Sequence, residues 1–305
     1  MKVAVTGATG LLGRATVPLL AEQGHEVVAL GREAGLLAER VAGPVARRAT
    51  SYAAADLQEA LAGCEAVVHL AARRVAPDGE GPAAFVTPNV ALTGRVLGAA
   101  AAAGVGRACL ASSISVYSAA NRLPFAEAEP PVPRSPYGAS KLAAEEVGRR
   151  WAASGGRRVI CLRFASLMGA GDETAGSRVL ATFLERARRG EPLVLWGEGG
   201  GGRDLIYVRD AARAVAAALA PQAPDGACNI GSGRPHSFRE VAETINAVFG
   251  NAGGLRFDPT RPEEATVAYM DCRRAAEHLG WAPRWDLRSA LEDLRDGGAA
   301  PGRRG

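Results

Sequence analysis

The amino-acid sequence predicts an α/β fold in which a doubly wound parallel sheet is accompanied by a smaller C-terminal lobe. Three observations lead to this prediction. Short apolar segments alternate with helical patterns through the first half of the chain, as expected for a parallel sheet that is covered on both faces. A glycine-rich turn follows the first apolar segment. After about Arg163 the alternation fades, and glycine-rich loops separate the helical patterns that we assign to the lobe.

The first half contains the elements that define the sheet. Each expected strand is a short apolar run, and each expected helix has apolar residues at helical spacing or an alanine-rich composition. The strands are expected at residues 2–6, 25–30, 45–49, 66–70, 107–111 and 158–163, of which 45–49 has the weakest pattern. The helices between them are expected at residues 11–23, 57–62, 91–103 and 137–153.

The second half is expected to form the smaller lobe. Its glycine-rich loops lie at residues 169–177 and 197–202. The sequence DGGAAPGRRG at residues 296–305 lacks side chains that could pack, so a mobile tail is expected there. The helices of this half are expected at residues 177–189, 208–219, 238–249, 273–279 and 287–294.

Composition argues against several classes of protein. The net charge is +4, and the basic residues occur in short pairs that do not alternate with aromatic residues, unlike a nucleic-acid-binding groove. No segment approaches the ~20 apolar residues of a membrane-spanning helix, and no signal peptide opens the chain. Five cysteines without a C-x-x-C unit are typical of a reducing compartment, so we expect a cytoplasmic protein. The four histidines lack metal-ligand spacing, and no metal site is expected.

A glycine-rich turn, VTGATGLLG at residues 5–13, joins the first strand to the first helix. Gly7, Gly10 and Gly13 leave room for a tight turn and for a pyrophosphate, and they let the helix pack closely on the strand. The N-terminus of the helix directs amide dipoles at the phosphates. The turn therefore predicts a Rossmann-like dinucleotide-binding domain. Its expected cofactor contacts are Gly7, Thr9, Gly10, Leu11, Leu12 and Gly13.

The residues after the second strand bear on the choice of cofactor. A domain that prefers NAD usually has Asp or Glu there, which binds the ribose 2′-hydroxyl. This chain has Leu-Gly-Arg-Glu at residues 30–33. Because a guanidinium binds phosphate through a planar fork, Arg32 favours NADP over NAD. The alternative is that Arg32 is exposed to solvent and Glu33 binds the ribose.

A second motif, SPYGASK at residues 135–141, opens a helix. Ser135 suits the N-cap and Pro136 suits the first helical position. Tyr137 and Lys141 are four residues apart and therefore share one face of the helix. A free tyrosine titrates near pH ~10. A neighbouring lysine charge and the positive ring of an oxidised nicotinamide would lower its pKa, so we expect the pair to act as a proton relay.

A cluster of hydroxyl groups follows the strand expected at residues 107–111 and consists of Ser112, Ser113 and Ser115. Ligands of parallel sheets gather at the carboxyl ends of the strands. One of these hydroxyls can therefore hold a substrate oxygen against Tyr137. Together with the glycine-rich turn and the Tyr–Lys pair, the cluster predicts an enzyme that transfers a hydride between a nicotinamide dinucleotide and its substrate.

These motifs resemble those of the extended short-chain dehydrogenase/reductases, specifically the NAD-dependent epimerase/dehydratase family that acts on nucleotide sugars. The resemblance runs over nearly the whole chain. Further matching segments are VVHLAA at residues 67–72, SSISVY at 112–117, LRF at 162–164, RDLIYVRD at 203–210, NIG at 229–231, RPEE at 261–264 and LGWAP at 279–283.

The resemblance implies roles for the matching residues. The catalytic residues would be Ser113, Tyr137 and Lys141. Beyond the glycine turn and Arg32, the cofactor would contact Leu70, Ala71, Ala72, Asn89, Tyr137, Lys141 and Phe164. The substrate, a nucleoside-diphosphate sugar, would contact Ser113, Ser166, Arg203 and Arg261. The two arginines suit a diphosphate because guanidinium groups bind pyrophosphate; the alternative is that both form only surface salt bridges.

Three departures from the family pattern limit these implications. The family's dehydratases have Thr-Asp-Glu where this chain has Ser-Ile-Ser at residues 113–115, so removal of water is not expected. The family's asparagine after the L-R-x segment is Ser166 here, which puts the seating of the sugar in doubt. The family's Asp-Leu pair near the adenine is displaced. The Asp-Leu pair at residues 56–57 is expected to start a helix, and Ser51 is the candidate for the adenine-side place.

Two catalytic functions and one non-catalytic function fit these observations. A nucleotide-sugar 4-epimerase would pass a hydride from C4 to the cofactor and return it to the other face of the 4-keto sugar. A 4-ketoreductase would use NADPH once and release both products. Frequency within the family favours the epimerase, which is the main hypothesis, whereas Arg32 favours the reductase. A dinucleotide-binding regulator is disfavoured because Ser113, Tyr137 and Lys141 are all present.

The expected organisation follows from these assignments. Residues 1–165, together with about 203–228, would bind the dinucleotide, and residues 166–202 and 229–296 would form the substrate-binding lobe. Residues 297–305 would be a flexible tail. We expect a homodimer, and we expect neither nucleic acid nor a membrane as a partner.

Overall fold

The computed structural model of the protein describes residues 1–74, 81–170, 178–262 and 266–297. Most of the expected loop at 169–177, two residues of the RPEE segment and most of the expected tail lie outside these ranges. Among the described residues, no helix combines the length and the apolar character that crossing a bilayer requires.

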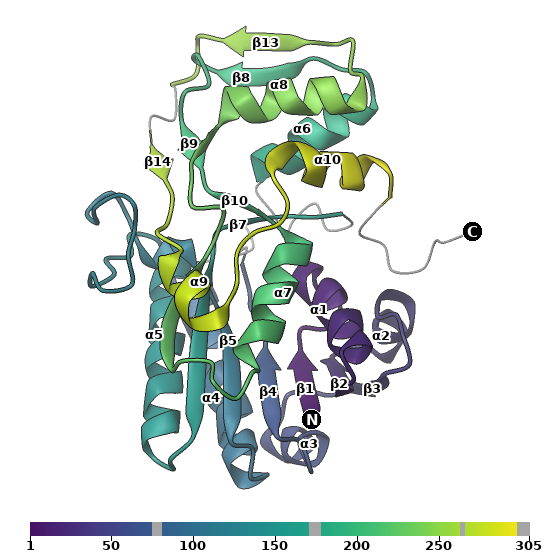
Figure 1. Cartoon of the computed structure of the whole chain (residues 1–305), viewed down its shortest axis with the longest axis vertical. Helices are drawn as coiled ribbons and strands as arrows, with labels where there is room; N and C mark the ends of the chain where they lie inside the picture. Colours follow the sequence, from purple (N-terminus) through teal and green to yellow (C-terminus); the bar gives the residue numbers. More distant parts are fainter. Residues whose placement is uncertain (75–80, 171–177, 263–265, 298–305) are drawn as a thin grey trace.

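Seven parallel strands form the central sheet in the order β11-β6-β5-β4-β1-β2-β3 (Figure 1). The chain runs from β1 to β2 and β3 on one side, and then crosses to β4 on the other side of β1. This reversal opens a crevice at the carboxyl ends of β1 and β4, where doubly wound sheets bind their ligands. The strands are β1 (Lys2–Thr6), β2 (Glu26–Gly31), β3 (Ala46–Ala49), β4 (Ala66–His69), β5 (Arg107–Ser113), β6 (Arg158–Phe164) and β11 (Gly226–Ile230).

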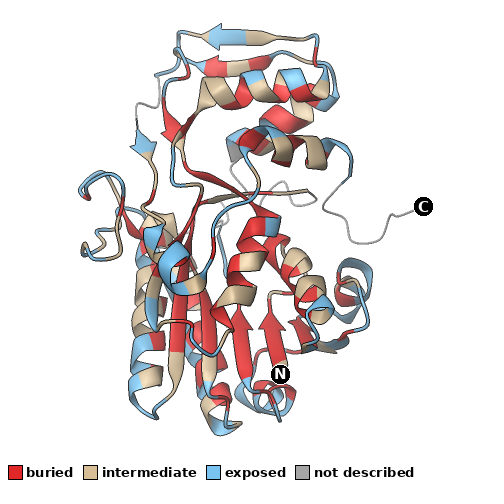
Figure 2. Ribbon diagram, in the orientation of Figure 1, coloured by how far each residue is buried: buried red, intermediate tan, exposed pale blue. Residues whose placement is uncertain are grey.

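Helices cover both faces of the sheet because side chains alternate along each buried strand. Val3 and Val5 of β1 belong to one hydrophobic core, whereas Ala4 belongs to the other. The first core is covered by α1 (Leu11–Glu22), α2 (Ala34–Arg40) and α7 (Val208–Ala218). The second is covered by α3 (Ala54–Ala60), α4 (Ala83–Ala102) and α5 (Pro136–Ala153). Figure 2 shows the strands as the most continuously buried part of the molecule. The predicted doubly wound parallel sheet is confirmed.

A smaller lobe lies beyond the carboxyl ends of the strands (Figure 1). Its helices are α6 (Arg178–Arg188), α8 (Phe238–Phe249) and α10 (Leu287–Arg295), and a parallel pair of strands, β8 (Leu193–Trp196) and β13 (Leu255–Asp258), covers them. Short strands connect the lobe to the sheet: β7 (Ser166–Met168), β9 (Gly202–Arg203), β10 (Leu205–Tyr207), β12 (His236–Ser237) and β14 (Val267–Ala268). The remaining elements are α9 (Arg273–Leu279) and the 3₁₀ turn η1 (Ile114–Val116).

The expected elements of the sheet agree with the structure to within a few residues, apart from one helix start and one missed helix. Helix α4 begins at Ala83 and not at residue 91. The helix continues through Pro88, although proline usually interrupts a helix. Helix α2 was not expected. Strands β7 to β14 were also missed, because each of them is stabilised by a strand that is distant in the sequence. In the central sheet, for example, Cys228 of β11 pairs with Leu162 of β6.

Candidate active site

The glycine-rich turn lies at the crevice and is tightly packed. Gly7 has φ +69°, and a β-carbon on it would lie 2.6 Å from the backbone nitrogen of Ala71 at the end of β4. A β-carbon on Gly13 would lie 2.2 Å from the carbonyl oxygen of Gly7. The N-cap of α1 is Gly10, and no side chain of the described residues caps this helix. The first amides of α1 are therefore available to an anion, which fits the phosphates of a dinucleotide.

The end of β4 is tied to this turn through a buried histidine. Thr6 and His69 are joined by a 2.7 Å hydrogen bond between Oγ1 and Nδ1, and the Nε2 atom of His69 lies 3.2 Å from Oγ1 of Thr93 on α4. Burial lowers the pKa of His69 to about 3, so its imidazole is neutral near pH 7. These bonds place the segment Leu70–Ala71–Ala72 beside the glycine turn.

After β3, the structure brings a tyrosine that the sequence did not select to the glycine turn. Tyr52 has φ 60° and is buried, and its hydroxyl bonds to the backbone of Gly7. The backbone of Gly7 and the charge of Arg32 partly offset the increase in the pKa of Tyr52 that burial causes. Arg32 and Glu33 are both exposed.

The helix start expected at residues 56–57 agrees with the structure to within a few residues. The Asp-Leu pair at residues 56–57 lies in the first turns of α3, which begins at Ala54. Ser51 precedes this helix, and its hydroxyl donates a hydrogen bond to the Asp56 carboxylate. This bond holds Ser51 at the start of the helix.

The Tyr–Lys pair lies on the first two turns of α5. Ser135 caps the helix, since its Oγ accepts a 3.0 Å hydrogen bond from the amide of Gly138, and Pro136 occupies the first turn, as predicted. Lys141 is only 6% exposed, and burial lowers its pKa to about 8. The hydroxyl of Ser113 at the end of β5 acts on the Tyr137 phenol, whose pKa it lowers. The structure thus brings together the three residues that the sequence selects for catalysis.

The pKa of Tyr137 differs from the expectation. In the protein alone it is raised, because burial of the phenol outweighs the opposing charge of Arg74 and the hydrogen bond with Ser113. The charge that opposes burial is that of Arg74 and not, as expected, that of Lys141. Removing the phenol from water disfavours the anion more than the neighbouring groups favour it. Only an additional positive charge beside the ring, such as that of an oxidised nicotinamide, would favour the phenolate further.

Asn89 on α4 fixes the segment that carries Arg74. Its Oδ1 accepts a 2.7 Å hydrogen bond from the amide of Arg73, and its Nδ2 donates to the carbonyl of Arg73 at 3.0 Å and to the hydroxyl of Ser140 at 3.0 Å. Ser140 in turn donates to the carbonyl of Tyr137 at 2.7 Å. Asn89 thereby connects the end of β4 to the catalytic helix.

The predicted substrate residues lie where the lobe meets the sheet. Phe164 at the end of β6 is buried and lies opposite Ser113 of β5. Ser166 on β7 is half-buried and pairs with Leu205 of β10. Arg203 on β9 is half-buried, with its Nη1 atom 2.8 Å from the carbonyl of Thr266.

Arg261 follows β13 on the surface of the lobe. Its guanidinium lies 4.9 Å from the centre of the Trp196 ring and 3.7 Å from the Asp258 carboxylate. Trp196 is 49% exposed. Both predicted arginines therefore contact an aromatic ring, since Arg203 lies over Phe238 at 5.8 Å.

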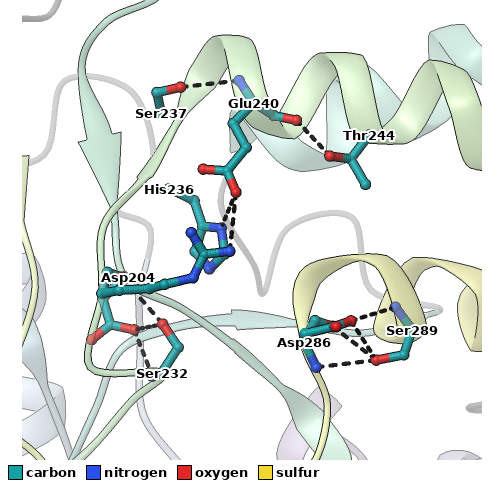
Figure 3. A network of polar contacts seen from close by, with 9 residues as sticks. Asp204, Ser232, His236, Ser237, Glu240, Thr244, Asp286 and Ser289 are labelled. Atoms are coloured by element: carbon teal, nitrogen blue, oxygen red, sulfur yellow. Dashed lines mark hydrogen bonds and ion pairs between the residues drawn. The ribbon is translucent and has the colours of Figure 1, made fainter.

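A buried carboxylate anchors the strand of Arg203 (Figure 3). Asp204 accepts hydrogen bonds of 2.7 Å from both the amide and the hydroxyl of Ser232, and a further one of 3.2 Å from the amide of Met270. A β-carbon on Gly231 would lie 2.5 Å from this carboxylate, so the turn requires glycine there. Asp204 thus holds β9 and β10 in place relative to the turn after β11.

A cavity of about 240 Å³ lies beside this network, between β7, β10, the turn at residues 232–236 and the segment 283–287. Arg234, His236 and Trp285 contribute to its wall. The cavity is not lined by Ser113 or Tyr137, so it is separate from the catalytic hydroxyls. Within the described ranges, no cluster of His, Cys, Asp and Glu is arranged to hold a metal ion.

Comparison with known proteins identifies the family. The model of the NAD dependent epimerase/dehydratase family matches residues 3–231. The chain belongs to this family. The UDP-glucose 4-epimerase of Azospirillum brasilense is 30% identical, over 95% of this chain and 91% of the relative. A similar solved structure is UDP-N-acetylglucosamine 4-epimerase from Bacillus cereus, with a TM-score of 0.85 and 32% identity over 98% of this chain and 99% of that one. Another is UDP-glucose 4-epimerase from Thermus thermophilus in complex with NAD, with a TM-score of 0.85 and 28% identity over 99% of this chain and 100% of that one.

Membership of the epimerase/dehydratase family confirms the sequence-based prediction of an extended short-chain dehydrogenase/reductase that depends on a nicotinamide dinucleotide. In such an enzyme, a phenol within hydrogen-bonding distance of a hydroxyl can exchange a proton with a bound alcohol. Lys141 lies one turn further along α5 and supplies a positive charge beside the phenol of Tyr137.

Three residues at the site were not selected from the sequence. Tyr52 belongs to no motif, and its contact with Gly7 depends on a left-handed backbone conformation. Arg74 lies two residues after VVHLAA, and its position just beyond a strand end was a usable signal. Trp196 precedes a glycine-rich loop, and only its exposure distinguishes it from a core residue.

Proposed function

We propose that this protein is a nucleotide-sugar 4-epimerase, which inverts the configuration at C4 of a nucleoside-diphosphate hexose. The observation that carries the proposal is the contact between Ser113 and Tyr137 above the buried Lys141, at the strand ends next to the glycine turn. The relatives named above, which are UDP-sugar 4-epimerases that match nearly the whole chain, support the same reaction.

The side chains assign the proton steps of this reaction. A bound nicotinamide dinucleotide supplies the acceptor, and later the donor, of the C4 hydride. Ser113 holds the C4 oxygen, and the phenolate of Tyr137 takes the proton of the C4 hydroxyl as the C–H bond breaks. After the 4-keto sugar has turned in the site, the hydride returns to the opposite face of C4 and Tyr137 returns the proton to the C4 oxygen. Positions 114 and 115, Ile and Ser, provide no acid–base pair for the removal of water.

Arg203 and Arg261 are the proposed diphosphate ligands, with Ser166 near the sugar. Guanidinium groups bind phosphate oxygens through paired hydrogen bonds. Arg203 belongs to β9, at the edge of the range 203–228 assigned to the dinucleotide-binding part, and Arg261 follows β13 in the lobe. Residues 166–202 and 229–296 remain the proposed substrate-binding lobe. The homodimer and the cytoplasmic location remain predictions.

The choice between NAD and NADP separates the epimerase from a 4-ketoreductase. The Thermus thermophilus structure contains NAD, which favours the epimerase. Arg32, which directly follows β2, favours NADP and therefore the reductase. If Arg32 binds a 2′-phosphate, Arg32→Gln should weaken NADPH binding about 10- to 100-fold and leave NADH binding unchanged. Fluorescence titration at fixed ionic strength measures both affinities, and equal wild-type affinities would exclude this role of Arg32.

Two measurements test the function itself. The first identifies the cofactor released on denaturing the purified protein, where tightly bound NAD indicates an epimerase and exchangeable NADP a reductase. The second follows UDP-glucose and UDP-N-acetylglucosamine by NMR for formation of the C4 epimer without added cofactor. Tyr137→Phe serves as the matched control. Absence of epimerisation of both sugars, together with NADPH consumption on a 4-keto sugar nucleotide, would replace the epimerase with the reductase.

A further inference from the structure

A buried ion pair lies directly behind the catalytic pair of α5. Glu145, one turn after Lys141, accepts hydrogen bonds of 2.9 Å from Nε and 2.7 Å from Nη2 of Arg163 on β6. The two side chains are only 10% and 6% exposed, respectively. Because burial removes both charges from water, such a pair gives little net stability compared with an apolar pair of the same size. Its presence here therefore calls for a reason other than stability.

The partners of Glu145 adjoin the groups that react. Ser112, the neighbour of Ser113 on β5, donates a hydrogen bond to Glu145. Arg163 precedes Phe164 on β6 and also donates to the Tyr117 hydroxyl at 2.7 Å. One carboxylate thus joins α5 to the carboxyl ends of β5 and β6, the three elements that position Tyr137, Lys141, Ser113 and Phe164.

The same carboxylate acts on the charge of Lys141. Burial lowers the pKa of Lys141 to about 8, and the charge of Glu145 opposes this decrease. Helix α4 presents the uncharged Asn89 to Ser140 of α5. The titratable groups that interact with Lys141 are Cys161 on β6, Glu145 on α5, and His69 on β4, which is neutral near pH 7.

We propose that Glu145 is a positioning residue for the reaction: it seats α5 against β5 and β6 and supplies the negative charge that keeps Lys141 protonated beside Tyr137. The proposal rests on the proposed function. An arginine does not lose its proton in a protein, so when Glu145 is neutralised the lysine is the cation that responds. A neutral Lys141 no longer favours the phenolate of Tyr137.

The composition of the chain makes this proposal directly measurable. Lys2 and Lys141 are the only two lysines among the 36 basic residues of Lys and Arg. Isotopic labelling of lysine therefore gives two ε-methylene NMR signals, and the titration of Lys141 can be followed on the full chain. Lys2 is half-buried at the N-terminal end of β1 and pairs with Glu26, so its pKa is raised and its signal is an internal reference.

Three variants separate charge from position. Glu145→Gln should lower the titration midpoint of Lys141 by about one pH unit, because the lysine loses a neighbouring opposite charge. Glu145→Asp keeps the charge and should restore most of that shift. Glu146→Gln is the matched control, because Glu146 lies on the same helix but pairs with Arg149 and Arg150 on the surface. The alkaline limb of the turnover–pH profile should move with the Lys141 midpoint in each variant.

The outcomes decide the proposal. Equal Lys141 midpoints in the wild type, Glu145→Gln and Glu146→Gln would overturn it, even if Glu145→Gln lowers turnover. Should Glu145→Gln fail to fold, the double variant Glu145→Gln/Arg163→Gln leaves no buried guanidinium without its carboxylate. A downward shift in the double variant supports the proposal, and an unchanged midpoint overturns it. Because the NMR readout needs no sugar, a shift in a protein without epimerase activity would refute the proposed function alone.

Discussion

Gly13 provides a quantitative test of the cofactor site. A β-carbon there would lie 2.2 Å from the carbonyl oxygen of Gly7 and 2.7 Å from the α-carbon of Ala8, both of which are backbone atoms. An ordinary contact begins near 3.4 Å, so in Gly13→Ala the turn and α1 must separate by roughly 1.2 Å, the difference between 3.4 and 2.2 Å. A displacement of this size disrupts hydrogen bonds from the first amides of α1 to a phosphate. Losing one charge-assisted bond costs about 1.5–3 kcal/mol, which corresponds to about 10- to 100-fold weaker NADH binding.

The assay is a fluorescence titration of NADH, and its control is a glycine without neighbours. Gly94 lies on the exposed face of α4, and a β-carbon there would meet no atom within 4 Å. Gly94→Ala should bind NADH as the wild type does and be stabilised by about 1 kcal/mol, because alanine favours a helix interior. Thermal unfolding without cofactor checks that Gly13→Ala is folded. Wild-type NADH affinity in a folded Gly13→Ala protein would show that the turn does not hold the phosphates.

Three further predictions concern the proton relay, a buried histidine and the lobe. Tyr137→Phe should lower epimerase turnover by roughly 10²–10⁴-fold while NADH binding stays intact; full turnover of this variant would end the assignment of Tyr137. Burial lowers the pKa of His69 from 6.5, the value in the unfolded chain, to about 3 in the native protein. Between these two pH values the unfolded chain binds a proton at His69 and the native protein does not. Acidification from pH 7 to pH 5 should therefore reduce stability by about 2 kcal/mol more in the wild type than in His69→Gln, and equal losses in urea unfolding would contradict the burial argument. Arg203→Ala and Arg261→Ala should each weaken UDP-sugar binding in calorimetry without affecting NADH, and unchanged sugar affinity in both variants would remove the diphosphate assignment.

The sequence was sufficient for the catalytic and cofactor motifs because each depends on local spacing. The glycines of residues 7–13 lie between a strand and a helix, and the four-residue spacing of Tyr137 and Lys141 places both on one helix face. The seven-residue strand β5 ends at Ser113, which puts this hydroxyl at the crevice as expected. Alternating apolar runs and helices also predicted the parallel sheet.

The lobe was harder to predict because its strands are short and pair over long distances. Strand β9 has two residues and lies between β12 and β14, which follow it by more than thirty residues. Such segments carry too few residues for a periodic pattern. Their position depends on the buried carboxylate of Asp204, whose partners come from other parts of the chain.

The sequence by itself selected the groups that we propose to react, whereas the tertiary structure decided how they are charged. Spacing along one helix selected Tyr137 and Lys141, but only burial shows that the pKa of Tyr137 is raised and that of Lys141 lowered to about 8. Arg163, which pairs with the charge of Glu145, lies eighteen positions further along the chain. Arg74, whose charge lowers the pKa of Tyr137, follows a different strand. The physical reason is that desolvation and Coulomb interactions depend on distances in space, which the folded sheet sets and which the order of residues along the chain does not reveal.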